Sequence, residues 1–99
     1  FLGTKVSFAN EMKMLCDEID IDYDKVVEYA TYDERLGKSH WAVPGPDGEL
    51  GFGGHCLPKD ISAIVNGYDD MKLLQAVLKV NDKVRKNRDW EDMKGRAVI

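Results

Sequence analysis

The 99-residue sequence contains only two cysteines, two histidines and three prolines, and it has no long apolar run. Two cysteines in an acidic chain of this size are typical of a reducing compartment and not of a disulfide-stabilised domain. A transmembrane helix needs a run of about 18 apolar residues, and none is present. No signal peptide can be identified either. The composition therefore predicts one cytoplasmic domain without a membrane anchor.

The chain also lacks an excess of basic residues and a metal-ligand pattern. Its net charge is −4, which argues against nucleic acid as a partner. Cys56, His55 and His40 come closest to a metal-binding set, but their spacing matches no zinc pattern, so we expect no metal site. No Gly-x-Gly-x-x-Gly turn precedes a predicted helix, and we therefore expect no dinucleotide site in this chain.

Apolar residues at steps of three and four predict a first helix from Phe1 to about Ile19. Cys16 lies on its apolar stripe and is expected to be a core residue. Lys5 and Asn10 are polar positions that we expect to face solvent. The apolar stripe is wide, which predicts that the helix is covered on more than one side; the residues that widen it are Phe8, Met14 and Leu15.

Two further apolar patterns predict helices on either side of a long loop. One helix is expected from Tyr23 to about Thr31, with Asp22 as its N-cap and Val26 among its inward residues. Another is expected from Pro58 to about Asn66, ending at Gly67 in the C′ position. Its inward residues are predicted to be Ile61, Ile64 and Val65.

The C-terminal third predicts a fourth helix and the beginning of a strand. Asp69 or Asp70 is expected to cap this helix, and its later turns carry a basic run that we interpret as a solvated face. One more turn is expected at residues 89–93, and Ala97-Val98-Ile99 resembles the start of a strand. The basic run comprises Lys79, Lys83, Arg85, Lys86 and Arg88.

Residues 38–54 show turn residues and little periodicity, which predicts a long loop. Pro44-Gly45-Pro46-Asp47-Gly48 is a strong turn cluster. A loop of this length in so small a domain is uncommon unless it binds something. His40 and Trp41 fit two interpretations, a stacking or hydrogen-bonding pair for a ligand and a hydrophobic plug that holds the loop in place.

The loop ends in Gly51-Phe52-Gly53-Gly54-His55-Cys56-Leu57-Pro58-Lys59-Asp60, the stretch with the most chemistry. Its glycines permit positive φ and close approach of a ligand to the backbone. Cys56 is expected at or just before a helix N-terminus, which favours the thiolate. Asp60 follows one helical turn later. The residues alone fit a nucleophile site and a buried free cysteine beside a glycine-rich turn equally well.

The same stretch resembles the catalytic-cysteine motif of the nucleotide-sugar 6-dehydrogenases, the UDP-glucose/GDP-mannose dehydrogenase family. Phe1 to Glu11 is similar to a helix of the family's central domain. Asp33-Glu34-Arg35-Leu36-Gly37 resembles its Asp-x-Arg-Ile-Gly turn, and Val80-Asn81-Asp82 resembles an Asn-Asp pair on a later helix. The resemblance thus covers nearly the whole chain.

The resemblance implies a small all-α domain, similar to the C-terminal domain of 6-phosphogluconate dehydrogenase, within a three-domain enzyme. Residues 1–94 would be the central domain, through which subunits form a homodimer. Residues 95–99 would begin the C-terminal nucleotide-sugar-binding domain. NAD would be bound by a domain absent from this chain, and the isolated piece is expected to be inactive.

The resemblance also implies a reaction and a role for each site residue. The sugar C6 alcohol would be oxidised to a carboxylate by two hydride transfers, through a thiohemiacetal and then a thioester on Cys56. Asp60 would activate or position water. The substrate-binding residues would be Arg35, reaching the neighbouring subunit's substrate, together with Phe52, Gly53 and Gly54 against the sugar.

The substrate that we expect is UDP-glucose, oxidised to UDP-glucuronate, with GDP-mannose or a UDP-N-acetylated sugar as alternatives. A second hypothesis is a helical dimerisation module without catalytic activity, which needs only apolar helix faces. The family's catalytic lysine and asparagine would lie upstream of Phe1, so Lys5 and Asn10 are not their counterparts. The loop around Pro44–Gly48 is longer than in many members of the family.

Overall fold

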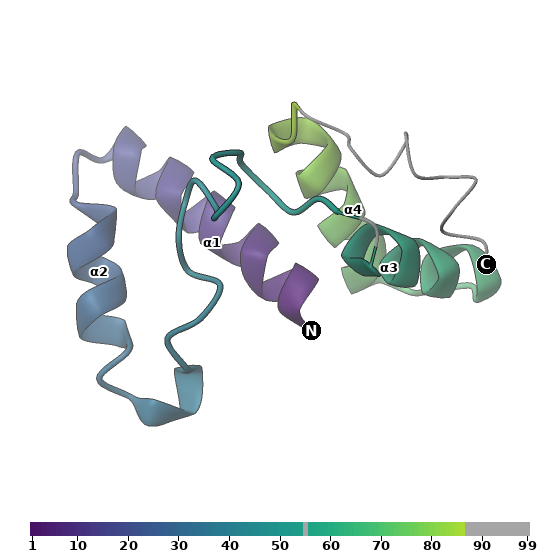
Figure 1. Cartoon of the computed structure of the whole chain (residues 1–99), viewed down its shortest axis with the longest axis horizontal. Helices are drawn as coiled ribbons and strands as arrows, with labels where there is room; N and C mark the ends of the chain where they lie inside the picture. Colours follow the sequence, from purple (N-terminus) through teal and green to yellow (C-terminus); the bar gives the residue numbers. More distant parts are fainter. Residues whose placement is uncertain (55, 87–99) are drawn as a thin grey trace.

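A computed structural model describes residues 1–54 and 56–86 of the chain. It contains four α-helices and one short 3-10 helix, and the described residues form no strand, so the predicted all-α fold is confirmed (Figure 1). The elements in chain order are α1 (Leu2–Glu18), α2 (Tyr23–Ala30), η1 (Glu34–Leu36), α3 (Cys56–Gly67) and α4 (Lys72–Val84).

Helix α1 is the central element of the domain. It contacts α2 on one side and α3 and α4 on the other, and α3 also packs against α4 (Figure 1). Gly3 permits the close approach of α1 to α3, because a Cβ at this position would collide with Ile61 Cδ1. The loop that follows η1 passes between α1 and α4 before it enters α3 (Figure 1).

The buried apolar residues form two clusters, one on each side of α1. Ala9, Cys16 and Tyr23 make the first cluster, which joins α1 to α2. The second cluster joins the loop to α3 and α4, and consists of Phe52, Ile61 and Val77. The prediction that Cys16 is a core residue is confirmed, since it is only 6% exposed.

Two residues predicted to face the core are exposed instead. Val26 is 40% exposed, whereas Tyr23 at the first position of α2 is 5% exposed. Helix α2 contacts α1 through Tyr23 and Val27, which are one turn apart, so Val26 lies beside this line and not on it. Ile64 is 42% exposed for the same reason: α3 packs through Ile61 and Val65, again one turn apart.

The helix ends differ from the predictions in three places and agree in one. Asp22 caps α2 as expected, because its Oδ1 accepts a hydrogen bond of 3.0 Å from the backbone N–H of Asp24. Helix α3 begins at Cys56, two residues before Pro58, which its first turn tolerates. It includes Gly67 as its last residue, so Gly67 is not a C′ glycine. The N-cap of α4 is Met71 and neither Asp69 nor Asp70.

The prediction that α1 is covered on more than one side is confirmed, since α2 contacts it on one side and α3 and α4 on the other, but the residues that widen its apolar stripe stay partly exposed. Phe8, Met14 and Leu15 are between 44% and 52% exposed. Met14 and Leu15 face an open hollow between α1 and α4, and the ring of Phe8 packs edge-on against Trp41, with the ring centroids 6.3 Å apart. An apolar helix face of this kind is typical of a surface that another protein chain covers.

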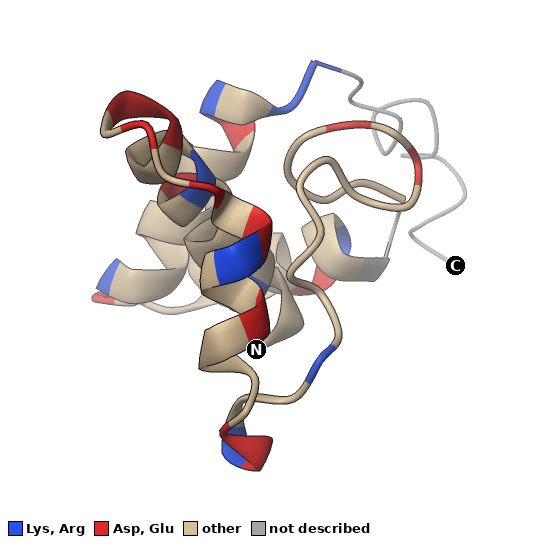
Figure 2. Ribbon diagram, turned by 90° about the vertical axis from the view of Figure 1, so that its left-hand side faces the viewer, with Lys and Arg blue, Asp and Glu red and all other residues tan. Residues whose placement is uncertain are grey.

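Charge is evenly mixed over the described helices. Figure 2 shows acidic and basic residues on the same helices, and no described helix of eight or more residues carries charge of one sign only. None of the described helices is both long enough and apolar enough to cross a membrane. The turn predicted at residues 89–93, the strand predicted at 97–99 and the domain boundary at 94/95 lie outside the described residues.

Tyr23 makes the stability of the domain sensitive to alkaline pH. Burial is the main cause that raises the pKa of Tyr23 to about 12. The folded domain thus retains a proton that the unfolded chain loses at about pH 10, and stability falls as the pH rises from about 10 to 12. We expect a loss of about 2–3 kcal/mol in the free energy of unfolding over this range.

Tyr23→Phe tests this assignment. The variant loses the 2.6 Å hydrogen bond from Tyr23 Oη to the carbonyl of Trp41, which costs about 1 kcal/mol at neutral pH. Because phenylalanine does not ionise, the variant should not share the loss of stability that Tyr23 causes between pH 10 and 12. The variant should therefore be less stable than the wild type at neutral pH and more stable at pH 12, so that the two stability curves cross. Urea unfolding followed by circular dichroism measures both curves; parallel curves would contradict the assignment.

Candidate functional site

A pocket of about 570 Å³ lies where the long loop meets α3. Three of the predicted substrate-binding residues, Phe52, Gly53 and Gly54, line it, together with Leu57 in the first turn of α3. The remaining lining residues come from α1 and the loop; they are Val6, Ser39, His40, Ala42, Gly45, Pro46, Asp47 and Gly51. The loop that the sequence predicts as a binding element therefore does enclose a pocket.

Cys56 is the first residue of α3, so its predicted place at a helix N-terminus is confirmed. Its side chain, like the whole of His55, lies outside the described part of the structure. Asp60 follows on the same helix, one turn later, and its carboxylate is 67% exposed. The Nζ atom of Lys59 lies 3.7 Å from Asp60 Oδ1. Asp60 is thus a solvent-accessible carboxylate near the start of α3.

The loop backbone at Phe52–Gly54 forms part of the pocket wall. Phe52 is only 4% exposed and clusters with Ile61 and Val77, so most of this residue belongs to the core. Gly54 has a φ of 77°, and a Cβ at this position would meet nothing within 4 Å. The glycine therefore leaves open space beside the backbone, where a ligand can approach closely.

Arg35 lies away from this pocket. It belongs to η1, at the opposite end of the domain from α3 (Figure 1). Its side chain is 87% exposed and donates hydrogen bonds of 2.6 to 3.2 Å to the Asp33 carboxylate. This pairing lowers the pKa of Asp33 and raises that of Arg35. Within one chain the structure does not bring Arg35 to the residues that line the pocket.

Trp41 holds the loop against α1 and α2. Its Nε1 donates a 2.8 Å hydrogen bond to the carbonyl of Gly37, and its own carbonyl accepts from Tyr23. The Nζ of Lys5 lies 5.2 Å from the centre of the indole ring, a cation–π contact. Two interpretations were open for His40 and Trp41, a ligand-binding pair and a hydrophobic plug that holds the loop in place. These contacts fit the second interpretation for Trp41. His40, with a φ of 66°, lines the pocket.

Two buried asparagines bind the backbone at the end of the loop. Asn81 Oδ1 accepts a 2.7 Å hydrogen bond from the N–H of Phe52, and Asn81 Nδ2 donates a 3.0 Å bond to the carbonyl of the same residue. Asn10 Oδ1 accepts from the N–H of Gly51 at 3.1 Å. Asn10 is 3% exposed, so the prediction that it faces solvent is wrong. Lys5, also predicted to face solvent, is half-buried and donates to the carbonyl of Leu36.

A buried arginine holds the turn cluster of the loop. Arg85 Nη2 lies 2.8 Å from Asp47 Oδ2, and the side chain of Arg85 is fully buried. The prediction that Arg85 belongs to a solvated basic face is therefore wrong. The hydrogen bond from Arg85 is the main cause that lowers the pKa of Asp47. Burial of a guanidinium is costly without a partner, and Asp47 provides one.

The spacing of these polar residues along the sequence is a signal of their burial. Val77 and Asn81 lie on one face of α4, and Arg85, the residue that caps its C-terminal end, continues the spacing of four. Asn10 follows Val6 by four on α1. A polar residue that continues an apolar stripe is forced into the interior, where it needs hydrogen-bond partners. The identity of those partners depends on the path of the loop, which periodicity does not predict.

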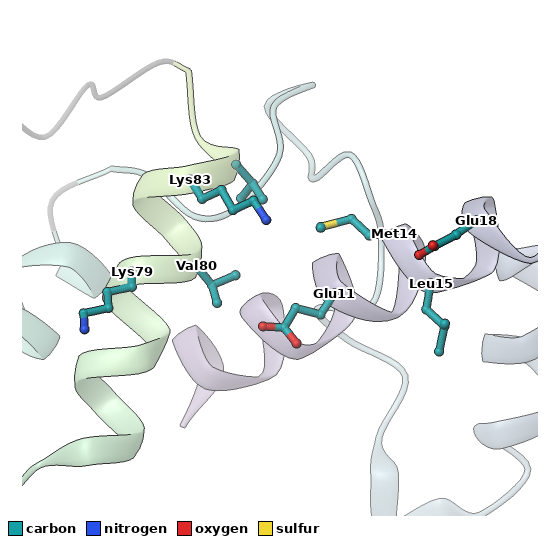
Figure 3. A pocket seen from close by; sticks show the side chains of 8 residues that line it. Glu11, Met14, Leu15, Glu18, Lys79, Val80 and Lys83 are labelled. Carbon is teal, nitrogen blue, oxygen red and sulfur yellow. The ribbon is translucent and has the colours of Figure 1, made fainter.

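A second hollow, of about 470 Å³, lies between α1 and α4 and contains none of the predicted site residues (Figure 3). Helix α1 contributes Glu11, Met14, Leu15 and Glu18, and helix α4 contributes Lys79, Val80, Lys83 and Val84. Within residues 1–54 and 56–86 no group of three or more potential ligands could hold a metal ion. The absence of a metal site in the whole chain stays a prediction.

The family model for the central domain of the UDP-glucose/GDP-mannose dehydrogenase family matches residues 1–83. The chain therefore belongs to this family of dehydrogenases and represents its central domain. The four-helix structure agrees with the resemblance inferred from the sequence. No solved structure matches the chain.

Several UDP-glucose 6-dehydrogenases are similar to this chain. The protein of Rickettsia bellii is 39% identical across 99% of this chain. TuaD of Bacillus subtilis is 36% identical across 86% of it, and AglM of Haloferax volcanii is 37% identical across 83%. The matched region spans only 24%, 18% and 19% of the length of these relatives, respectively.

Proposed function

We propose that this chain is the central domain of an NAD-dependent nucleotide-sugar 6-dehydrogenase that oxidises UDP-glucose to UDP-glucuronate. The observation that carries the proposal is the pocket lined by Phe52, Gly53 and Gly54 at the beginning of the helix that Cys56 starts. Three relatives from different groups of organisms are named as UDP-glucose 6-dehydrogenases, which supports this substrate.

The residues of this chain do not fit a dinucleotide. The described part has no strand, and the sequence has no Gly-x-Gly-x-x-Gly turn before a helix. NAD, which accepts hydride in this class of reaction, would be held by another part of the protein. The helices of this chain would bind the sugar, supply the nucleophile and activate the water.

Cys56 is proposed as the covalent nucleophile. Its thiolate sulfur adds to the carbonyl carbon of the C6 aldehyde, the carbonyl oxygen takes up a proton, and a thiohemiacetal forms. Loss of hydride from that carbon, together with the hydroxyl proton, gives a thioester. Water then adds to the thioester carbon, and the C–S bond breaks to release the acid and the thiolate. The helix N-terminus stabilises the thiolate at the start and at the end.

Asp60 is proposed to accept a proton from the attacking water. A carboxylate can do so when it is ionised and reaches the water directly. Its 67% exposure leaves it hydrated, and its position one turn after Cys56 keeps it on the side of α3 where the helix begins. These observations are compatible with a role in hydrolysis of the thioester.

The pocket suits an uncharged sugar better than a diphosphate. Asp47 and His40 are the only acidic or basic residues among the lining residues given above, and Asp47 is paired with Arg85. Diphosphates are commonly bound by Arg and Lys side chains, and the lining residues given above include neither. We therefore place the hexose ring in this pocket and the nucleotide outside the described residues.

Arg35 is proposed to act on the substrate of a second subunit in a homodimer. Arg35 lines a different hollow from the one that Phe52, Gly53 and Gly54 line. The exposed apolar residues of α1 offer a surface for a second subunit, and both observations support this arrangement. Each site would then combine Cys56 of one subunit with Arg35 of its partner.

Mixed dimers test the shared site. Cys56→Ser and Arg35→Ala subunits of the full-length protein are each expected to be inactive alone. After unfolding, mixing and refolding, half of the dimers should be mixed, and one of the two sites in each should be intact. We expect about a quarter of the wild-type activity to return. Absence of any recovery, with mixed dimers shown by mass spectrometry, would place Arg35 outside the partner's site.

The substrate is tested in the full-length protein by following NADH formation with UDP-glucose, GDP-mannose and a UDP-N-acetylated hexosamine in turn. We expect the highest kcat/KM with UDP-glucose. A preference for either of the other sugars would keep the chemistry and change the substrate. Absence of NADH with all three would contradict the proposed function.

A helical dimerisation module without chemistry is the second candidate, and the exposed Phe8, Met14 and Leu15 favour it. The rate of alkylation by iodoacetamide against pH separates the two candidates. An activated Cys56 should react with an apparent pKa well below the usual value for cysteine of about 8.5. A Cys56 as slow as the buried Cys16 would favour the module.

A further inference from the structure

The last turn of α4 connects to the pocket at two separate points of the loop. Asn81 binds both backbone groups of Phe52, and Arg85, one turn later, pairs with Asp47. The N–H of Arg85 donates to the carbonyl of Asn81 at 2.8 Å, so both side chains extend from one hydrogen-bonded turn. Asp47 and Phe52 both line the pocket.

The two hydrogen bonds from the Asn81 side chain fix the position of the backbone at Phe52. An apolar side chain at position 81 would fill the same space, but it would not fix the register of the loop. The amide of Asn81 pairs with the N–H and the carbonyl of one residue, as a neighbouring strand would. Asn81 is only 2% exposed, and a buried amide in such a place must have both of its groups satisfied.

The turn cluster around Asp47 is internally hydrogen-bonded. The N–H of Gly45 donates to the carbonyl of Glu49 at 2.9 Å, and Asp47 Oδ1 accepts from the N–H of Glu49 at 3.0 Å. Hydrogen bonds therefore join residues 45–49 to one another, and the ion pair between Asp47 and Arg85 attaches this turn to the end of α4. Arg85 therefore places one side of the pocket, and Asn81 places the other.

We propose that Asn81 and Arg85 are positioning residues, which hold residues 45–54 so that the pocket aligns the sugar with Cys56. This inference rests on the proposed function of the pocket. It assigns no contact with substrate to either residue. It makes the geometry of the site depend on the end of α4, a helix that contributes none of the residues lining the pocket.

Kinetics of the full-length protein test the proposal. In Asn81→Ala we expect kcat to fall about 100-fold, because a misplacement of about 1 Å costs that much. The KM for NAD should stay within about twofold, since the cofactor is held elsewhere. Arg85→Met should lose about tenfold in kcat, whereas Arg85→Lys, which keeps a cation for Asp47, should stay within about threefold of wild type.

Val27→Ala is the matched control for loss of stability. Val27 packs against the cluster of Ala9, Cys16 and Tyr23, and not against residues 45–54 of the loop. The control should lower Tm and leave kcat unchanged. If Asn81→Ala and Arg85→Met also lower Tm and keep the wild-type kcat, the two residues are merely structural and the proposal is wrong.

A second readout separates this proposal from the proposed function. The rate of iodoacetamide alkylation at Cys56, relative to that at Cys16, should change at least about fivefold in Asn81→Ala. Peptide mass spectrometry measures both rates without any substrate. If the wild-type protein oxidises no nucleotide sugar but this ratio changes, the positioning role stands and the proposed function fails. An unchanged ratio overturns the positioning role whatever the activity.

Discussion

Replacing Cys56 by serine in the full-length protein is expected to lower the rate of sugar-acid formation by more than about 10³-fold. A serine hydroxyl is far less nucleophilic than a thiolate at neutral pH, because the N-terminus of α3 stabilises the thiolate and does not ionise an alcohol. Binding of the nucleotide sugar should be retained, since the remaining pocket is unchanged. Isothermal titration calorimetry and product analysis by mass spectrometry measure the two quantities.

Cys16→Ser is the matched control for this variant. Cys16 is 6% exposed in the core between α1 and α2, so its replacement should reduce stability without affecting the chemistry. Full acid formation by Cys56→Ser would contradict the covalent role. Loss of acid formation in both variants, with equal unfolding of both, would show only that the domain had been destabilised.

Gly51→Ala is expected to have the largest effect on stability. Gly51 has a φ of 72°, and a Cβ there would collide with Asn81 Oδ1 and lie 3.1 Å from Val84 Cγ2. The left-handed conformation costs about 1–2 kcal/mol for alanine. Displacement of Asn81 would leave the N–H of Phe52 buried without its acceptor, which costs about a further 1–3 kcal/mol. We expect a total loss of about 2–5 kcal/mol in the free energy of unfolding.

Gly54→Ala separates the two causes. Gly54 has a similar φ of 77°, but a Cβ there meets nothing within 4 Å. It should lose only the conformational part, about 1–2 kcal/mol. Urea unfolding of both variants gives the difference. Equal losses would mean that the contact between the loop and Asn81 adds nothing to stability.

Much of the helical framework could be predicted from the sequence because it depends on local spacing. The apolar stripe of α1, the Asp22 cap of α2 and the place of Cys56 at the start of α3 all follow from neighbours within four residues. The inward faces of α2 and α3 were harder to predict. Short helices with few contacts bury one narrow line of residues, and both Val26 and Ile64 lie beside that line.

The connections of the loop could not be predicted, because they join residues far apart in the sequence. Asn81 and Phe52 are 29 positions apart, and Asn10 and Gly51 are 41 apart. Arg85 was misinterpreted for a related reason. Basic residues near a helix end are usually solvated, and the carboxylate that pairs with this buried one, Asp47, lies in a distant part of the sequence.

The site motif was predicted from residues 51–60, and the family match supports the interpretation. The roles of Cys56, Asp60 and Arg35 stay predictions. Their test needs the substrate and the cofactor together with the full-length protein. The separation of Arg35 from the pocket is a result that sequence spacing could not provide.

The most direct test of the account is the number of NADH molecules formed for each nucleotide sugar consumed by the full-length protein. We predict two NADH for each UDP-glucose, because oxidation of an alcohol to a carboxylate removes four electrons and the aldehyde stays bound to Cys56 between the two steps. One NADH for each sugar, with free aldehyde as the product, would contradict the account, since a simple alcohol dehydrogenase has no need of a covalent cysteine.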